Sequence, residues 1–108
     1  MTTLSARFAQ SPAETKRYVM DYTLQLASGE AIESVAVNVT QTGGPTTGPA
    51  LLINAIALLP PVNGVIPGAA FFASGGADGC QYEVQFLATT TIGQILEDIV
   101  QFALAEKL

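Results

Sequence analysis

The chain has no histidine and no tryptophan, and it contains only one cysteine in 108 residues. The lack of histidine excludes Ser-His-Asp and Cys-His catalysis and the usual zinc sites. A single cysteine cannot form an intrachain disulfide, so the fold does not depend on an oxidising compartment. Because Cys80 has no histidine to activate it, we expect it to behave as a small buried hydrophobe.

Charge is also scarce, at 12% of the residues against 49% hydrophobic, with a net charge of −5. The basic residues are Arg7, Lys16, Arg17 and Lys107. Nucleic-acid binding needs clustered basic side chains for phosphate contacts, so this composition argues against a nucleic-acid partner. The start of the chain, residues 1–7, lacks a basic stretch followed by an apolar one. We therefore expect synthesis in a cytoplasm without export, as a single domain over residues 1–108.

No charged residue occurs in the 44 positions from Ser34 to Ala77. The longest apolar part of this segment, Ala50 to Val62, contains Asn54 and Pro60-Pro61 and is too short to cross a bilayer. A membrane contact is therefore not expected. Exposed domains normally distribute charge over their surface, so the segment predicts strands and loops that are buried or covered by another protein.

Apolar and polar residues alternate with a period of two along much of the chain, as in half-buried strands. Strands are predicted over Thr3–Gln10, Tyr18–Leu26, Ile32–Val39, Leu51–Leu59, Gly68–Ser74 and Tyr82–Thr90. Ser11–Glu14 and Ala27–Glu30 have turn sequences, and Thr40–Pro49 and Pro60–Pro67 are predicted loops. A Gly-rich corner leads into the strand that starts at Tyr82. This order is typical of an immunoglobulin-like sandwich, in which a corner tyrosine hydrogen-bonds to nearby backbone.

The last segment, Ile92–Leu104, is compatible with two structures. Ile92, Ile95, Leu96 and Ile99 repeat at helical spacing, and Thr91 with Gln94 resembles a capping box. Val100, Phe102 and Leu104 instead alternate as in a strand, and Gly93 suits the tip of a hairpin better than a helical first turn. The pattern alone leaves both open.

Nine acidic residues are the only other candidates for chemistry: Glu14, Asp21, Glu30, Glu33, Asp78, Glu83, Glu97, Asp98 and Glu106. Asp21 and Asp78 each precede a tyrosine and could act as an acid–base pair or bind calcium. However, Asp78 between Ala77 and Gly79 is typical of a side chain that closes a turn, and calcium sites draw more ligands close in sequence. No catalytic, metal or cofactor-binding residue is predicted, and the chain is not expected to be an enzyme.

A carbohydrate-binding or adhesion module is the alternative function. Such modules present aromatic platforms, but Tyr18, Tyr22 and Tyr82 alternate with aliphatic residues and are predicted to be core or corner residues.

Several fragments, taken in order, resemble the phage fiber-tail adaptor proteins, which are small tail-accessory proteins of tailed bacteriophages. The matching residues are Ser11-Pro12, Tyr18, Asp21-Tyr22, Gly29-Glu30-Ala31-Ile32, Gly75-Gly76, Gly79, Tyr82, Val84, Thr90-Thr91-Ile92-Gly93-Gln94, Glu97 and Val100-Gln101-Phe102. The chain departs from the family pattern at Tyr22, where the family has Trp, at Val37, where it has an aromatic residue, and at Gln94, where it has Arg. Replacing an aromatic residue by Val37 removes core volume that a bulkier neighbour would have to supply.

The resemblance implies an all-β, immunoglobulin-like sandwich of about seven antiparallel strands, with a strand rather than a helix at the C-terminal end. It also implies a structural role in the virion, at the tail or neck, in which several copies in a symmetric assembly contact other tail, neck or fiber subunits. The expected contact surfaces are the uncharged loops Gln41–Pro49 and Pro60–Pro67 and any exposed part of Leu51–Leu59.

Overall fold

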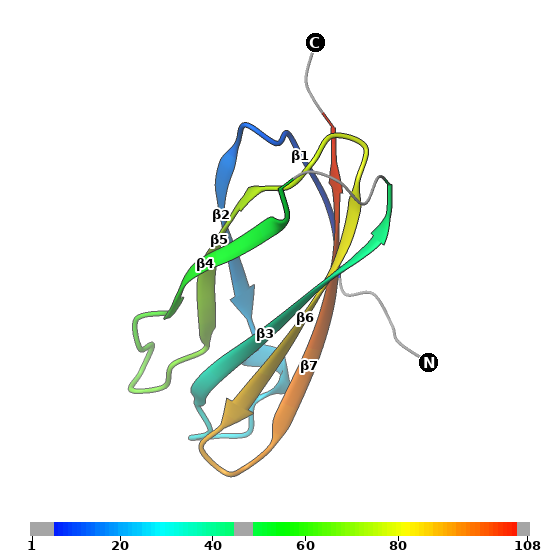
Figure 1. Ribbon diagram of the computed structural model, residues 1–108. Helices are drawn as coiled ribbons and strands as arrows, with labels where there is room; N and C mark the ends of the chain where they lie inside the picture. The colour runs from blue at the N-terminus through cyan, green and yellow to red at the C-terminus, as the bar shows by residue number, and fades with distance from the viewer. Residues whose placement is uncertain (1–5, 45–48, 106–108) are drawn as a thin grey trace.

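The computed structural model describes residues 6–44 and 49–105 (Figure 1). They form seven strands and one short 3-10 helix: β1 (Ala6–Gln10), β2 (Thr15–Asp21), η1 (Thr23–Gln25), β3 (Ile32–Gly43), β4 (Leu51–Leu58), β5 (Gly68–Gly75), β6 (Gln81–Thr90) and β7 (Ile95–Leu104). A four-stranded sheet in the order β1-β7-β6-β3 faces a three-stranded sheet in the order β2-β5-β4. The predicted all-β sandwich is therefore confirmed.

The strand orders β3-β6-β7 and β4-β5-β2 are those of the C-F-G and D-E-B strands in immunoglobulin constant domains. The immunoglobulin-like assignment stays a prediction that this order supports. One pair departs from the expected antiparallel arrangement, because β1 runs parallel to β7. The chain crosses to the other sheet directly after β1, so β1 has no hairpin partner to impose an antiparallel direction. The single-domain boundary at residues 1–108 also stays a prediction.

The crossing between the sheets is made at the predicted turn Ser11–Glu14. The Glu14 N–H donates to the Ser11 carbonyl at 3.0 Å, and the Ser11 N–H donates to Glu14 Oε1 at 2.8 Å. The buried side chain of Gln10 donates to the Ala73 carbonyl of β5 at 2.8 Å. These bonds join the end of β1 to the opposite sheet.

Two sequence predictions of strand length are wrong. The predicted strand Tyr18–Leu26 ends at Asp21, and Leu24, expected on the inner face, is 101% exposed. Asp21 Oδ1 accepts hydrogen bonds from the Thr23 N–H and hydroxyl, which turns the chain out of the strand. Conversely, Thr40–Gly43, predicted as loop, continues β3, because β6 provides pairing partners as far as Gln81.

β6 is the predicted strand Tyr82–Thr90 with one residue more at its start, and its buried residues alternate. Val84, Phe86 and Ala88 are fully buried, and the residues between them are partly covered. The Tyr82 hydroxyl lies at the corner, where it accepts the Ala77 N–H and donates to the Pro49 carbonyl, both at 3.4 Å. Cys80 is buried, as expected.

The C-terminal segment is strand β7, so the prediction from the family resemblance is confirmed. Val100, Phe102 and Leu104 lie in the core. Gly93 is at the tip of the β6–β7 hairpin with a φ of +90°, and its N–H donates to the Thr90 carbonyl. This left-handed backbone favours glycine and excludes the helical reading.

Five aromatic rings join the two sheets across the core. They come from five different strands: Phe8, Tyr18, Phe71, Phe86 and Phe102. Phe71 lies 4.7 Å from Phe86 and 5.5 Å from Tyr18, measured between ring centroids. Tyr18 in turn lies 5.3 Å from Phe102 and 4.5 Å from Phe8. We call these residues the five-ring cluster.

Phe71 links Phe86 to the other rings of this cluster, whereas its sequence neighbour Phe72 points away from the core and is 38% exposed. We expect Phe71→Ala to lower the free energy of unfolding by about 3–5 kcal/mol, because it removes a buried ring and leaves a cavity. Phe72→Ala is the matched control and should cost less than about 1 kcal/mol. Urea denaturation followed by circular dichroism checks this, and equal losses would contradict the assignment of Phe71 as the link.

Candidate functional site

Three connections gather at one end of the sandwich, the lower end in Figure 1, and we call this the groove end. It consists of residues 21–33, the loop Pro60–Pro67 and residues 91–95. Backbone hydrogen bonds hold these segments together, from the Tyr22 N–H to the Pro67 carbonyl, from the Ile32 N–H to the Ile66 carbonyl and from the Thr91 N–H to the Ala31 carbonyl.

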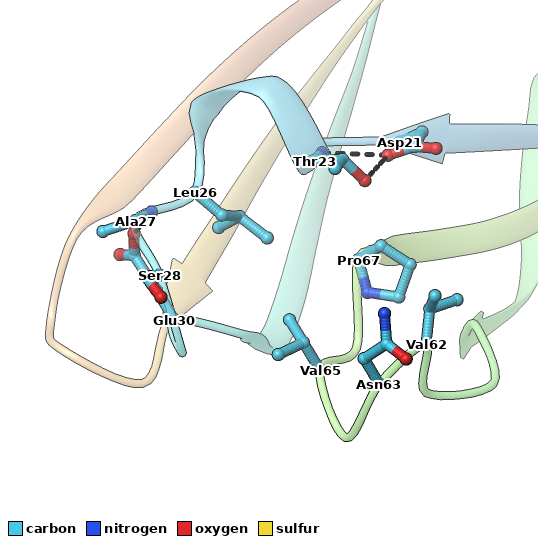
Figure 2. Close-up of a pocket in the computed structure, with 10 residues that line it drawn as sticks. All are labelled: Asp21, Thr23, Leu26, Ala27, Ser28, Glu30, Val62, Asn63, Val65 and Pro67. Carbon is cyan, nitrogen blue, oxygen red and sulfur yellow. Dashed lines mark hydrogen bonds between the residues drawn. The ribbon is translucent and has the colours of Figure 1, made fainter.

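A groove with a volume of about 480 Å³ opens at this end, between the segment after β2 and the loop Pro60–Pro67 (Figure 2). Its lining residues are Asp21, Thr23, Leu26, Ala27, Ser28, Glu30, Val62, Asn63, Val65 and Pro67. This volume is in the range that small ligands or single side chains of a partner occupy.

One wall of the groove is a tight hairpin that the sequence analysis treated as plain loop. Val62 and Val65 exchange backbone hydrogen bonds of 2.8 and 3.0 Å, and Asn63 and Gly64 between them have φ values of +52° and +78°. Positive φ at both central residues defines a type I′ turn, for which Asn-Gly is the preferred sequence. The Asn-Gly pair between two valines was therefore a usable sign of this hairpin.

The opposite wall is shaped by Glu30, whose side chain is 1% exposed. The Glu30 N–H donates to the Ala27 carbonyl at 3.0 Å, and Glu30 Oε1 accepts the Ala27 N–H at 2.8 Å (Figure 2). The same pair of hydrogen bonds, one to the backbone carbonyl and one to the carboxylate, closes the turn at Ser11–Glu14. Glu30 Oε2 is buried and has no hydrogen-bond partner among the described residues. Glu30 therefore fixes the predicted turn Ala27–Glu30 against the sandwich.

The second carboxylate of the groove, Asp21, is exposed and already engaged with Thr23. Hydrogen bonds from the Thr23 hydroxyl and N–H lower the pKa of Asp21. Asp21 therefore stays charged at neutral pH and adds negative charge to the mouth of the groove.

The groove end also exposes large apolar side chains. Leu24 is 101% exposed, and Val62, Ile92 and Ile95 are between 61% and 66% exposed. The charged residues of these segments are the acids Asp21, Glu30 and Glu33, and the segments contain no Lys or Arg. An apolar surface with acidic neighbours suits a partner that is apolar and basic.

The uncharged segment Ser34–Ala77 forms one side of the sandwich. It contributes nearly all of β3, the whole of β4 and β5, and the loop Pro60–Pro67. Exposed apolar residues on β4 are Leu52 and Leu58, as the expected contact surface requires. Of the predicted contact loop Gln41–Pro49, residues 45–48 lie outside the described residues.

Asp21 and Asp78, the two acids considered as an acid–base or calcium-binding pair and set aside in the sequence analysis, lie far apart. Asp21 lies beside Gly68 at the start of β5, and Asp78 follows the end of β5 at Gly75. The length of β5 separates them by about 20 Å. Within residues 6–44 and 49–105, no group of three His, Cys, Asp or Glu side chains gathers where it could hold a metal ion. In the same ranges the structure has no helix of the length and apolarity needed to cross a membrane.

The three tyrosines are core or corner residues, as predicted. Tyr22 and Tyr82 are buried, and Tyr18 is half-buried within the five-ring cluster. None of them offers the aromatic platform that a carbohydrate-binding module would use. Burial raises the pKa of Tyr22, and the nearby Asp98 carboxylate raises it further.

The comparison with protein families gives one clear result. The model of the family described as podophage GP4 fiber-tail adaptor protein gp77 matches residues 10–103. No curated protein matches the chain. The matched range includes the strands from β2 to β6, most of β7 and every segment of the groove end.

The role of Glu30 can be tested by comparing Glu30→Ala with Glu30→Gln. We expect Glu30→Ala to lower the free energy of unfolding by about 1–3 kcal/mol, because the Ala27 N–H loses its acceptor and a buried volume is emptied. Glu30→Gln keeps the acceptor and the volume and should restore at least half of this loss in urea denaturation. Glu33→Ala, an exposed acid nearby, serves as control; equal losses for the two Glu30 variants would contradict the role of the acceptor.

The buried Tyr22 predicts a loss of stability at high pH. Its pKa is higher in the folded chain than in the unfolded chain, so above about pH 10 the folded state holds more protons and the free energy of unfolding falls as the pH rises. Burial raises the pKa of Tyr18 and Tyr82 in the same direction. Tyr22→Phe should therefore make the decline between pH 10 and 11.5 shallower without abolishing it. A decline of unchanged slope in thermal melts would be evidence against this.

Proposed function

Because the chain belongs to the podophage fiber-tail adaptor family, we propose that it is a structural virion protein that joins tail fibers to the tail or neck by protein–protein contacts at its groove end. The family assigns an adaptor role at the phage tail. The choice of surface is our own inference from the structure. Synthesis in the host cytoplasm and assembly as several copies around the tail are parts of the same proposal.

One observation carries the choice of the groove end: large apolar side chains are exposed beside a groove, on a rim that has acids and no basic residue. Val62 and Leu24 project from the two connections that border the groove, and Ile92 extends the apolar surface along the hairpin β6–β7. Burial of such side chains at an interface removes apolar area from water, while the acids select the partner by charge.

The local backbone supports a role as a docking surface. The hairpin at Asn63-Gly64 and the turn closed by Glu30 fix both walls before a partner arrives. A surface that is already ordered loses less conformational entropy on binding. The Pro residues at both ends of the loop Pro60–Pro67 add to this rigidity.

The test is a charge placed on the groove end. Val62→Asp should abolish or strongly reduce incorporation of the chain into phage particles, because it buries an unpaired carboxylate at the interface. Since Val62 is 61% exposed, the melting temperature of the isolated chain should change little. Val62 is a cleaner probe than Val65, whose side chain is half-buried. Incorporation is measured by mass spectrometry of purified particles.

Val19→Asp is the matched control, because Val19 is 51% exposed, lies on β2 among charged residues and does not line the groove. We expect this variant to be incorporated like the unmodified chain. Equal incorporation of Val62→Asp and Val19→Asp would reject the groove end as the docking surface. Absence of the unmodified chain from particles would reject the adaptor function itself.

A further inference from the structure

The two sheets have four edge strands among the described residues, β1 and β3 in one and β2 and β4 in the other. An open edge has unpaired N–H and C=O groups that invite another strand, and proteins normally block it with charge, shortness, proline or a bulge. Three of the edges are blocked in this way. β1 has only five residues and contains Arg7; β2 carries Lys16, Arg17 and Asp21; β4 is broken by a bulge between Asn54 and Ala57, where Ala55 has a φ of +53°.

The fourth edge, that of β3, has none of these features. β3 spans twelve residues, Ile32–Gly43, and shifts register only near its two ends. From Ser34 to Gln41 it pairs with β6 without interruption, and this stretch has no charged residue and no proline. Within the described part of the chain, no strand pairs with its other side. The regular, uncharged edge formed by the seven residues Ser34–Thr40 is therefore open among the described residues.

A row of apolar side chains lies along this edge on the inner face of the sheet. Val35, Val37 and Val39 are paired with Ala88, Phe86 and Val84, which are fully buried. Val35 and Val37 are nevertheless only partly buried, and Val39 is 38% exposed. The outer side chains Ser34, Ala36, Asn38 and Thr40 are exposed and neutral. An added strand with apolar residues at alternate positions would complete the cover of the valine row.

Space for such a strand follows from the geometry. In immunoglobulin variable-type sandwiches, further strands extend the sheet from the strand in this position. Gly44, the residue after β3, lies against Gly79 and Cys80 on the side of β6 and not of the open edge, and a Cβ atom there would come within 2.6 Å of the Cys80 Cα. The φ of +88° at Gly44 is one that glycine adopts readily.

We propose that the open edge of β3 binds an extended segment of another virion protein, which adds a strand to the four-stranded sheet. This deepens the proposed function and rests on it. The backbone of Ser34–Thr40 provides main-chain hydrogen bonds, and the valine row selects a segment with apolar residues at alternate positions. The net charge of −5 on each copy disfavours direct pairing of β3 with β3 of a second copy at close range, so a segment of a different protein is the better occupant.

The occupant is identified by photo-crosslinking in assembled particles. A benzophenone amino acid placed at Ala36, which is exposed on β3, should crosslink to one extended segment of another virion protein, mapped by mass spectrometry. The control carries the benzophenone amino acid at position 19 in place of Val19, and it should not crosslink to that segment. Crosslinks from position 36 to β3 of a second copy, or no crosslink above the control, would overturn the proposal.

A variant pair tests the chemistry of the edge. Val39→Lys places a charge in the valine row, where an added strand would bury it, and should reduce the crosslink yield from position 36 at least tenfold. Val39→Thr keeps a neutral β-branched side chain and should retain most of the yield. Melting of the isolated variants shows whether the fold is intact. A crosslink yield for Val39→Lys equal to that of the unmodified chain would overturn strand addition.

These experiments distinguish a failure of strand addition at β3 from a failure of the proposed adaptor function. If Val39→Lys keeps the crosslink and is incorporated normally, while Val62→Asp is excluded from particles, strand addition at β3 is wrong and docking at the groove end stands. If the unmodified chain is absent from particles, the adaptor function is rejected, and the edge proposal falls with it.

Discussion

The five-ring cluster is the contact on which the sandwich depends. Its rings come from β1, β2, β5, β6 and β7, so a single aromatic contact network ties five of the seven strands together across both sheets. A chain with a single cysteine and few charged residues must obtain its stability from burial, and large rings bury the most area per residue. The ion pair between Lys16 and Glu14 is 3.7 Å long and partly exposed, so it adds little.

β3 and β4 contribute no ring to the five-ring cluster, and their inward residues pack differently from those of the other strands. Their inward residues are aliphatic, and Val35, Val37, Ile53 and Ile56 are only partly buried. Charge is missing from the same strands after Glu33, whereas β1, β2, β6 and β7 all carry it. The rings thus come from β1, β2, β5, β6 and β7, whereas the edge strands β3 and β4 pack through aliphatic residues and carry no charge after Glu33; at the edge of β3 a partner strand has room to pair.

Most of the fold could be predicted from the sequence because strands with one buried face alternate regularly. Val84, Phe86 and Ala88 followed this rule, and so did Tyr18, Met20 and Tyr22. Errors arose where a local polar contact or a distant partner decided the outcome. Asp21 ended β2 by binding Thr23, although the apolar alternation continued to Leu26. Thr40–Gly43 looked like loop by composition but became strand, because β6 lay opposite and exposed strand faces tolerate polar residues.

The candidate docking features were harder to predict than the fold, since they depend on which segments meet at one end or one edge. The residues of the groove end come from three separate parts of the chain, which are brought together by hydrogen bonds to the Pro67, Ile66 and Ala31 carbonyls. The long uncharged segment predicted a covered surface. Composition alone did not distinguish β5, which lies in the centre of a sheet, from the edge strands β3 and β4 of the same segment. An adaptor has to hold two partners at once. At the groove end the partner contacts side chains, and at the edge of β3 the partner forms main-chain hydrogen bonds. These two modes of recognition use different atoms, so they do not compete.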